Sequence, residues 1–215
     1  MKISVVIPAY NEEKRIGSVL SEVKKTGLEI IVVDDGSKDG AAKIAKKYTP
    51  YVLVHKINLG KGAALKTGCE AAFGLGAEAV ILMDADGQHK AEDLPKFIDA
   101  LKKHEVVFGV RNLEGIPTVR LLGNKLITLL VKIFFGIKVP DILCGFKAFS
   151  ERAYRKINWS SLGYSVETEI VAMVGKYRLN HCQVPVATVY YDKFKGLTAE
   201  TGLEILIDIL RFKLR

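Results

Sequence analysis

The sequence has few cysteines and no long hydrophobic run. Its three cysteines, Cys69, Cys144 and Cys182, are widely spaced and form no CxxC pair among the 215 residues. Such a set predicts neither a disulfide framework nor a zinc site and is typical of a reduced cytoplasmic protein. The hydrophobic segments fall short of the ~20 residues that a membrane-spanning helix needs. The first residues, MKISVVIPAYNEE, lack the small-residue cleavage site of a signal peptide, so we expect no secretion.

Tracts rich in Ser, Pro or Gln are also absent. Hydrophobic residues make up 49% of the chain and charged residues 26%, a composition that excludes an intrinsically disordered protein. The length fits one domain, or one domain with an appendage. We therefore expect the chain to fold throughout and to bury a core.

The net positive charge lies in the second half of the chain. Residues 1–100 contain 14 of the 32 Lys and Arg residues and 14 of the 24 Asp and Glu residues, so residues 101–215 carry the whole net charge of +8. A local basic field implies an anionic partner: nucleic acid, a membrane surface or a phosphorylated substrate. The second half has no aromatic-rich RNA-binding motif and no recognisable DNA-reading helix, which argues against nucleic acid.

Short apolar runs alternate with helical patterns through the first half. The runs are almost entirely apolar, which is typical of strands buried on both faces of a parallel sheet. We expect strands at residues 3–7, 30–33, 51–54, 79–83 and 106–110, and a last one at 184–191. Apolar spacing predicts helices around residues 16–23 and 94–101. The alternation predicts an α/β protein with a mostly parallel sheet flanked by helices, whose ligands bind at the carboxyl ends of the strands.

Two helical patterns in the second half are both apolar and basic. Residues 119–135 are mostly Leu, Ile, Val and Phe, interrupted by Arg120, Lys125 and Lys132, and residues 201–214 have a wide apolar face. Such helices suit an interfacial position, with the apolar side in the acyl region of a bilayer and the cations at the head groups. The alternative is that one or both helices pack on the sheet or on a second subunit.

Acidic residues follow the fourth predicted strand. Asp84-Ala85-Asp86 places two carboxylates where they can hold a hard divalent cation, with coordination positions left for phosphate oxygens. Gln88 can add a neutral oxygen ligand or hold a metal-bound water. Such a cation offsets the charge that develops on a departing diphosphate. The alternative is a polar loop that caps a helix.

Two further polar segments follow strands. Asp34-Asp35-Gly36-Ser37 can place a carboxylate against the ribose or base of a nucleotide, although a simple turn that caps the next helix fits as well. The segment 58–62, Asn-Leu-Gly-Lys-Gly, looks like a phosphate loop. It is not a complete GxGxxG, because Leu65 stands at the third glycine, and it is not a Walker motif. A dehydrogenase or a P-loop ATPase is therefore disfavoured.

These segments carry a family resemblance. VVIPAYNEEKRI, VVDDGSKDG, NLGKGAALKTG, MDADGQH and DILCGFK, in this order and spacing, resemble glycosyltransferase family 2, in the branch of the dolichyl-phosphate (polyprenyl-phosphate) mannose and glucose synthases. The resemblance covers about the first 150 residues. It implies a GT-A type fold, the nucleotide-diphospho-sugar transferase fold. Residues 1–200 would then form the catalytic domain, including an acceptor- or membrane-facing segment at about 115–138, and residues 201–215 a C-terminal amphipathic helix.

The resemblance also implies an activity. It is an inverting transfer of a hexosyl unit from a GDP- or UDP-sugar to a polyprenyl (dolichyl) phosphate, with Mg²⁺ or Mn²⁺ as cofactor. We expect a protein bound peripherally at the cytoplasmic face of a membrane, with no nucleic acid partner; the oligomeric state stays open. Cys144 and Lys147 stand where the family often has Ser and Arg, and Lys90 where it often has Pro; neither change removes a metal ligand.

The family's functional residues carry over to matching positions. The donor nucleotide-sugar would contact Pro8, Tyr10, Asn11, Glu12, Asp34, Asp35, Lys61, Asp84 and Asp86. The metal would be held by Asp84, Asp86 and Gln88. The acceptor phosphate would lie at Arg111, Arg120 and Asn124, with Lys193 and Lys195 within reach. Asp86, Arg111 and Arg120 are the expected catalytic residues, and arginine suits the phosphate because its planar fork donates two parallel hydrogen bonds.

The nature of the acceptor decides whether a base is needed. A phosphate is already an anion near neutral pH and attacks without a general base, whereas a hydroxyl acceptor needs a carboxylate within reach. Glu167 and Glu169 lie near where hydroxyl-glycosylating relatives place such an acid, so a glycan or glycolipid hydroxyl is the alternative acceptor. A nucleotidyltransferase is disfavoured, because 8–12 is not the glycine-rich loop that it requires.

Overall fold

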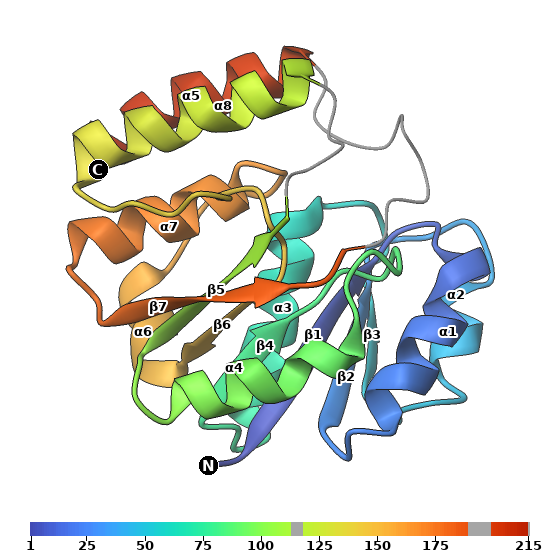
Figure 1. Ribbon diagram of the computed structural model, residues 1–215. Coiled ribbons are helices and arrows are strands. Elements are labelled where there is room, and N and C mark those ends of the chain that lie inside the picture. The colour runs from blue at the N-terminus through green and yellow to red at the C-terminus, as the bar shows by residue number, and fades with distance from the viewer. Residues whose placement is uncertain (113–117, 189–198, 215) are drawn as a thin grey trace.

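The computed structural model describes residues 1–112, 118–188 and 199–214, which form one layered α/β unit (Figure 1). In chain order the elements are β1 (Ile3–Ala9), α1 (Glu13–Lys24), β2 (Glu29–Asp34), α2 (Ala41–Ala45), β3 (Val52–Val54), α3 (Lys61–Gly74), β4 (Ala79–Leu82), the short 3-10 helix η1 (Ala91–Asp93), α4 (Leu94–Leu101), β5 (Val106–Arg111), α5 (Thr118–Phe135), β6 (Lys147–Ser150), α6 (Glu151–Ile157), α7 (Val166–Lys176), β7 (His181–Val186) and α8 (Ala199–Leu214).

The described strands form one sheet of seven, in the order β3-β2-β1-β4-β6-β5-β7. All neighbouring strands pair in parallel except β6, which is antiparallel to both β4 and β5. The expectation of a mostly parallel sheet is therefore confirmed. Because β6 reverses the direction twice, the carboxyl ends of β1, β2, β4 and β5 all lie at one edge. The sequence analysis missed β6, and the last strand begins earlier than expected, at His181.

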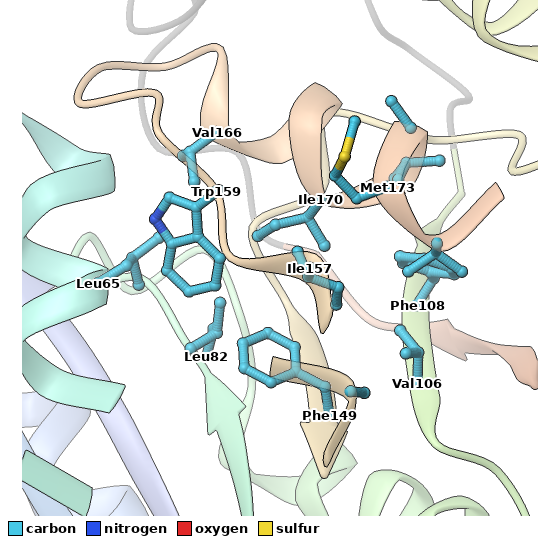
Figure 2. Packing of buried hydrophobic residues seen from close by; sticks show 14 of the residues in the cluster. Leu65, Leu82, Val106, Phe108, Phe149, Ile157, Trp159, Val166, Ile170 and Met173 are labelled. Carbon is cyan, nitrogen blue, oxygen red and sulfur yellow. The ribbon is translucent and has the colours of Figure 1, made fainter. Parts of the chain in front are cut away.

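Both faces of the sheet are covered by helices. Side chains alternate along β1, so that Val5 and Ile7 join the core beneath α1 and α4, and Val6 joins the core on the opposite face. That second core is filled by helices α3, α5, α6, α7 and α8. Figure 2 shows its centre, where Trp159 lies among Leu65, Leu82 and Phe149. The near-continuous apolar strands reflect this burial on both sides.

Helices α5, α7 and α8 form a further layer on one side of the sheet, with α5 and α8 side by side (Figure 1). Ile127 and Val131 of α5 and Ile205 and Ile209 of α8 face inward and are buried. One face of each helix thus packs on the rest of the chain. This agrees with the alternative stated above, in which the two helices pack on the protein itself. None of the helices in the described ranges combines the length and apolar composition needed to cross a bilayer.

The close contact between α3 and the sheet gives a test of the packing. A Cβ on Gly68 would overlap Val6 and come within 3.1 Å of Val33 Cγ2, whereas a Cβ on Gly74 of the same helix meets nothing within 4 Å. Because overpacking typically costs about 1–3 kcal/mol, we expect Gly68→Ala to lower the free energy of unfolding by that amount. Gly74→Ala is the matched control and should not lower it. Urea denaturation measures both, and equal effects would contradict the packing described here.

Candidate active site

Lys61 lies at the centre of a cluster of charged side chains at the carboxyl edge of the sheet. It begins α3, and its Nζ lies 2.7 Å from Asp84 Oδ1 and 2.6 Å from Glu167 Oε1. Asp84 follows β4, and Glu167 lies in the first turn of α7. Three segments far apart in the sequence therefore meet at one amine. The sequence analysis named Lys61 and Asp84 as donor residues but did not predict the contact with Glu167.

Charge balance determines the ionisation of this cluster. Burial alone would lower the pKa of Lys61, but the Asp84 and Glu167 carboxylates outweigh it and hold that pKa well above its ordinary value. Burial would likewise raise the pKa of Asp84, yet the charge of Lys61 and the nearby His89 hold it well below its usual range. Asp86 differs, because burial and the charge of Asp84 raise its pKa. Asp86 is thus a carboxylate whose charge lacks full compensation.

The segment from Asp141 to Lys147 supports Asp84 from below. A Cβ on Gly145 would overlap the carboxylate of Asp84, so glycine is required for this close approach. Lys147 is buried, and its Nζ donates to the carbonyl oxygens of Ile142, at 3.0 Å, and Cys144. Burial lowers the pKa of Lys147. The DILCGFK motif therefore acts here as a support, with its lysine turned into the protein.

The Asp84 and Asp86 carboxylates fit a divalent cation shared with a ligand. Asp86 Oδ1 accepts a hydrogen bond from the Gln88 backbone amide at 3.0 Å, while Oδ2 has no hydrogen-bond partner among the described residues. Within the ranges that the structure describes, no group of three or more His, Cys, Asp or Glu side chains is arranged to hold a metal. Mg²⁺ is commonly bound by one or two carboxylates with the remaining positions filled by water and substrate phosphates. Two carboxylates at an open edge meet that requirement.

His89 is a neighbour that the sequence analysis did not single out. Its Nε2 lies 3.8 Å from Asp84 Oδ2, and its Nδ1 is buried without a partner in the described part of the chain. The backbone of His89 also forms an isolated β-bridge with Thr188. The loop after β4 is thereby attached to the chain that follows β7. Only its adjacency to the Asp84 motif could have marked His89 in the sequence.

The first two motifs are joined to each other. Asn11 has a positive φ of 54°, donates from its backbone to Ser37 Oγ at 2.9 Å, and accepts from the Lys38 amide at 2.9 Å. Pro8 is buried at the end of β1, whereas Tyr10 is 44% exposed beside it. Glu12 pairs with Arg15 at 3.5 Å. The predicted donor residues at 8–12 therefore lie together at the carboxyl edge, with Tyr10 and Asn11 exposed.

Asp34 and Asp35 are both buried, and both organise loops. Asp34 accepts a hydrogen bond from the Ser37 hydroxyl. Asp35 accepts from the backbone amides of Leu59, at 3.0 Å, and Gly60, at 2.8 Å, and its Oδ1 lies 2.7 Å from His55 Nδ1. Asp34 thus stabilises its own turn, whereas Asp35 holds the segment 55–60, and the N-cap residue of α2 (Gly40) has no side-chain cap. A contact from Asp35 to a base or ribose remains a prediction.

The glycines at 60 and 62 serve a close approach of the backbone. Gly60 has a φ of +98°, and a Cβ on Gly62 would overlap the carbonyl of Ser161. The amides of Gly62 and Ala63, at the start of α3, donate to the Leu162 carbonyl at 2.6 and 3.2 Å. These amides are therefore occupied by the chain itself. With the Leu59 and Gly60 amides held by Asp35, four amides of the segment 59–63 are engaged within the protein.

Glu169 holds the chain segment that closes on these glycines. Its two carboxylate oxygens accept from the Ser160 amide at 3.0 and 3.1 Å, and Oε2 accepts from the Ser161 amide at 2.8 Å. The side chain is fully buried. Glu167 instead pairs with Lys61. The two candidate bases are therefore both engaged within the protein.

The predicted acceptor residues are described only in part. The Arg111 guanidinium forms a two-point ion pair with Asp141, with Nε 2.6 Å from Oδ2 and Nη2 2.9 Å from Oδ1. Asn124 is buried and donates to the Pro140 carbonyl at 3.3 Å. The side chain of Arg120 lies outside the described part of the structure, as do Lys193 and Lys195. Arg111 is thus placed at the carboxyl end of β5, and Asn124 joins α5 to the segment before Asp141.

The role of Glu169 can be tested by stability. Glu169→Gln keeps the size of the side chain but replaces one accepting oxygen by a donor that faces backbone amides. Because a buried amide left without an acceptor costs about 1–3 kcal/mol, we expect a loss of that size in the free energy of unfolding by urea denaturation. Glu151→Gln, at an exposed pair with Arg155, is the control and should change it by less than about 0.5 kcal/mol. An unchanged stability of the Glu169 variant would contradict its role as the loop anchor.

The chain is similar to known proteins along most of its length. The family model "Glycosyl transferase family 2" matches residues 4–158. An uncharacterized protein of Methanocaldococcus jannaschii is 36% identical, over 99% of this chain and 93% of its own length. The UDP-N-acetylglucosamine–dolichyl-phosphate N-acetylglucosaminyltransferase of Methanococcus voltae is 30% identical, over 99% of this chain and 96% of its own.

A solved structure confirms the fold. Glucosyl-3-phosphoglycerate synthase from Mycobacterium tuberculosis, crystallised with Mn²⁺, UDP and glucosyl-3-phosphoglycerate, superposes with a TM-score of 0.78 at 21% identity, covering 98% of this chain and 79% of that one. At this identity the likeness establishes the GT-A type fold alone. The family match over residues 4–158 and the 30% identity to the Methanococcus voltae relative show that the chain belongs to glycosyltransferase family 2 and is a glycosyltransferase.

Proposed function

We propose that this enzyme transfers a hexosyl unit from a GDP- or UDP-sugar to a polyprenyl phosphate, with Mg²⁺ or Mn²⁺ bound at Asp84 and Asp86. The observation that carries the proposal is the pair of carboxylates beside Lys61 at the carboxyl edge of the sheet. The Methanococcus voltae relative, similar along nearly the whole chain, is named for a nucleotide-sugar donor and a dolichyl-phosphate acceptor. That name supports the same two substrate classes here.

The cation and the protein would divide the work of stabilising the leaving diphosphate. A divalent cation supplies Lewis-acid stabilisation of negative charge that develops on phosphate oxygens. Asp84 and Asp86 would hold it, and Lys61 adds a positive charge at the same edge. Tyr10 and Asn11, which lie at the end of β1, would line the nucleotide side of the site. A site organised in advance in this way avoids the cost of ordering water around the charge.

A phosphate acceptor fits the engaged state of the two glutamates. A hydroxyl acceptor would need a carboxylate base with a lone pair directed at it. Glu169 spends its oxygens on the amides of Ser160 and Ser161, and Glu167 is paired with Lys61. A phosphate needs only to be positioned, and Arg111, oriented by Asp141, is suited to that. The hydroxyl alternative is therefore the weaker of the two.

An exposed apolar stripe supports contact with a membrane surface. On α5, Leu122, Leu126, Leu129 and Ile133 recur at helical spacing on the outer face and are 47–65% exposed; on α8, Ile207, Leu210 and Leu214 are exposed as well. The two helices are neighbours in Figure 1. Lys125 and Lys132 of α5 and Arg211 of α8 are also exposed. We propose that this surface, the α5/α8 stripe, binds peripherally at the cytoplasmic face of a membrane, where the acceptor lipid is held.

Asp86→Asn tests the metal-dependent transfer. We expect the variant to fold normally but to lose transfer from the nucleotide sugar by on the order of 10²–10³-fold, because the charge stabilisation of the leaving group is lost. Incorporation of radiolabelled sugar into polyprenyl phosphate, across a panel of GDP- and UDP-sugars with Mn²⁺, measures it. Asp99→Asn, at an exposed pair with Lys102, is the control. Full activity of the Asp86 variant, or of the unaltered enzyme with excess chelator, would exclude the metal site.

The same assay discriminates the acceptors. Free polyprenol of equal chain length should not replace the phosphorylated lipid, because Glu169 is held by the Ser160 and Ser161 amides and Glu167 is paired with Lys61 and only 7% exposed. Efficient transfer to the free alcohol that is lost in Glu167→Gln would establish the hydroxyl alternative.

The membrane proposal predicts a loss of binding when the stripe is charged. The double substitution Leu126→Glu and Leu129→Glu should weaken binding to vesicles of phosphatidylcholine and phosphatidylglycerol by at least about tenfold, since burial of a leucine side chain contributes about 1.5–3 kcal/mol. Leu75→Glu, at an exposed leucine beyond α3, serves as the control in vesicle sedimentation. Unchanged binding would contradict the proposal. A change in sedimentation coefficient without vesicles would instead assign the stripe to a second copy of the chain.

A further inference from the structure

Lys61 stands between two carboxylates with different access to a ligand. Its distances to Asp84 Oδ1 and Glu167 Oε1 are nearly equal, at 2.7 and 2.6 Å. The side chain of Asp84 is 22% exposed and that of Glu167 only 7%. The more accessible partner is thus the carboxylate expected to bind a cation. The less accessible one lies in the first turn of α7.

Glu167 has hydrogen-bonding capacity that the described contacts do not use. Its Oε2 is buried and accepts no hydrogen bond within the described ranges. A buried carboxylate oxygen without a hydrogen-bond donor costs folding free energy. A donor that moves within reach of this oxygen removes that cost. Oε2 of Glu167 can therefore accept a hydrogen bond from the Lys61 amine in addition to the contact that Oε1 already makes.

We propose that Lys61 is an internal counter-ion of Asp84, and that it leaves Asp84 for Glu167 when a divalent cation binds at Asp84 and Asp86. This inference rests on the metal-dependent function proposed above. It makes Glu167 a positioning residue that acts through Lys61. No bond is made or broken in this step; the amine exchanges one hydrogen-bonded carboxylate for both oxygens of another.

Electrostatic balance gives the direction of each effect. Asp84, Asp86 and Glu167 outnumber Lys61 in charge, so the cluster can accept a cation. An amine 2.7 Å from the same carboxylate oxygen opposes that cation, because like charges repel strongly at short range. Lys61 therefore competes with the cation, and Glu167 relieves the competition by offering the amine a second place. Removal of Lys61 should strengthen cation binding, and removal of the Glu167 charge should weaken it.

The test is the affinity of the whole chain for Mn²⁺ without nucleotide, measured from the electron paramagnetic resonance signal of free Mn²⁺. We expect Lys61→Met to bind Mn²⁺ about tenfold more tightly than the unaltered chain, and Glu167→Gln to bind it severalfold more weakly. Lys66→Met is the matched control: it removes the same charge from the same helix, and the described hydrogen bonds of Lys66 go to Asn158 and Trp159. Its affinity should stay within about twofold of the unaltered chain.

The opposite signs of the two effects distinguish this inference from a structural role. If Lys61 only stabilised the fold, the Lys61→Met substitution would lower the melting temperature without changing the Mn²⁺ affinity. Equal affinities, or weaker binding by Lys61→Met, would overturn the inference and leave the metal site in place. Absence of Mn²⁺ binding by the unaltered chain would overturn both. Melting curves from circular dichroism identify a variant that fails to fold, and the remaining one then decides the outcome.

Discussion

The contact of one amine with two carboxylates is the interaction on which the site depends. Lys61, Asp84 and Glu167 come from α3, the end of β4 and α7, so the contact forms only when all three elements are in place. A buried ion pair rarely stabilises a fold, because desolvation of the charges offsets their attraction. The apolar core shown in Figure 2 offsets this desolvation cost. Its residues Val166 and Ile170 hold α7, the helix that bears Glu167, against the rest of the protein. Apolar packing therefore holds the charges together, and their retention is better explained by function than by stability.

The antiparallel strand β6 gives the site its second support. Its position between β4 and β5 brings the preceding segment beneath the carboxyl ends of both strands. From that segment Gly145 makes room for Asp84, and Asp141 orients Arg111. A wholly parallel sheet would put a crossover helix at this place. The reversal thus lets one short stretch of chain shape both the donor side and the expected acceptor side.

Local patterns predicted the parts of the molecule that depend on local chemistry. Buried strands appear as apolar runs, and the acids that follow them must share an edge once the strands are parallel, so Asp84 and Asp86 could be placed from the sequence alone. The four residues of β6 carry no such pattern, since Lys147 is buried there and its amine donates to the carbonyl oxygens of Ile142 and Cys144 in the preceding loop. Glycine is required at position 62 by the close approach of Leu162, about 100 residues further along the chain, and Glu169 is required to hold the segment that contains Leu162. Contacts of this kind have no signal in periodicity or motif spacing.

Chain connectivity links the candidate site to the α5/α8 stripe. Arg111 ends β5 at the same edge of the sheet as Asp84, and α5 begins at Thr118. Seven residues of extended chain reach at most about 25 Å, so the start of α5 must lie within that distance of Arg111. Leu122, the first exposed leucine of the stripe, follows within about one further turn. The proposed phosphate position at Arg111 and the first residue of the proposed membrane surface are therefore at most about 30 Å apart.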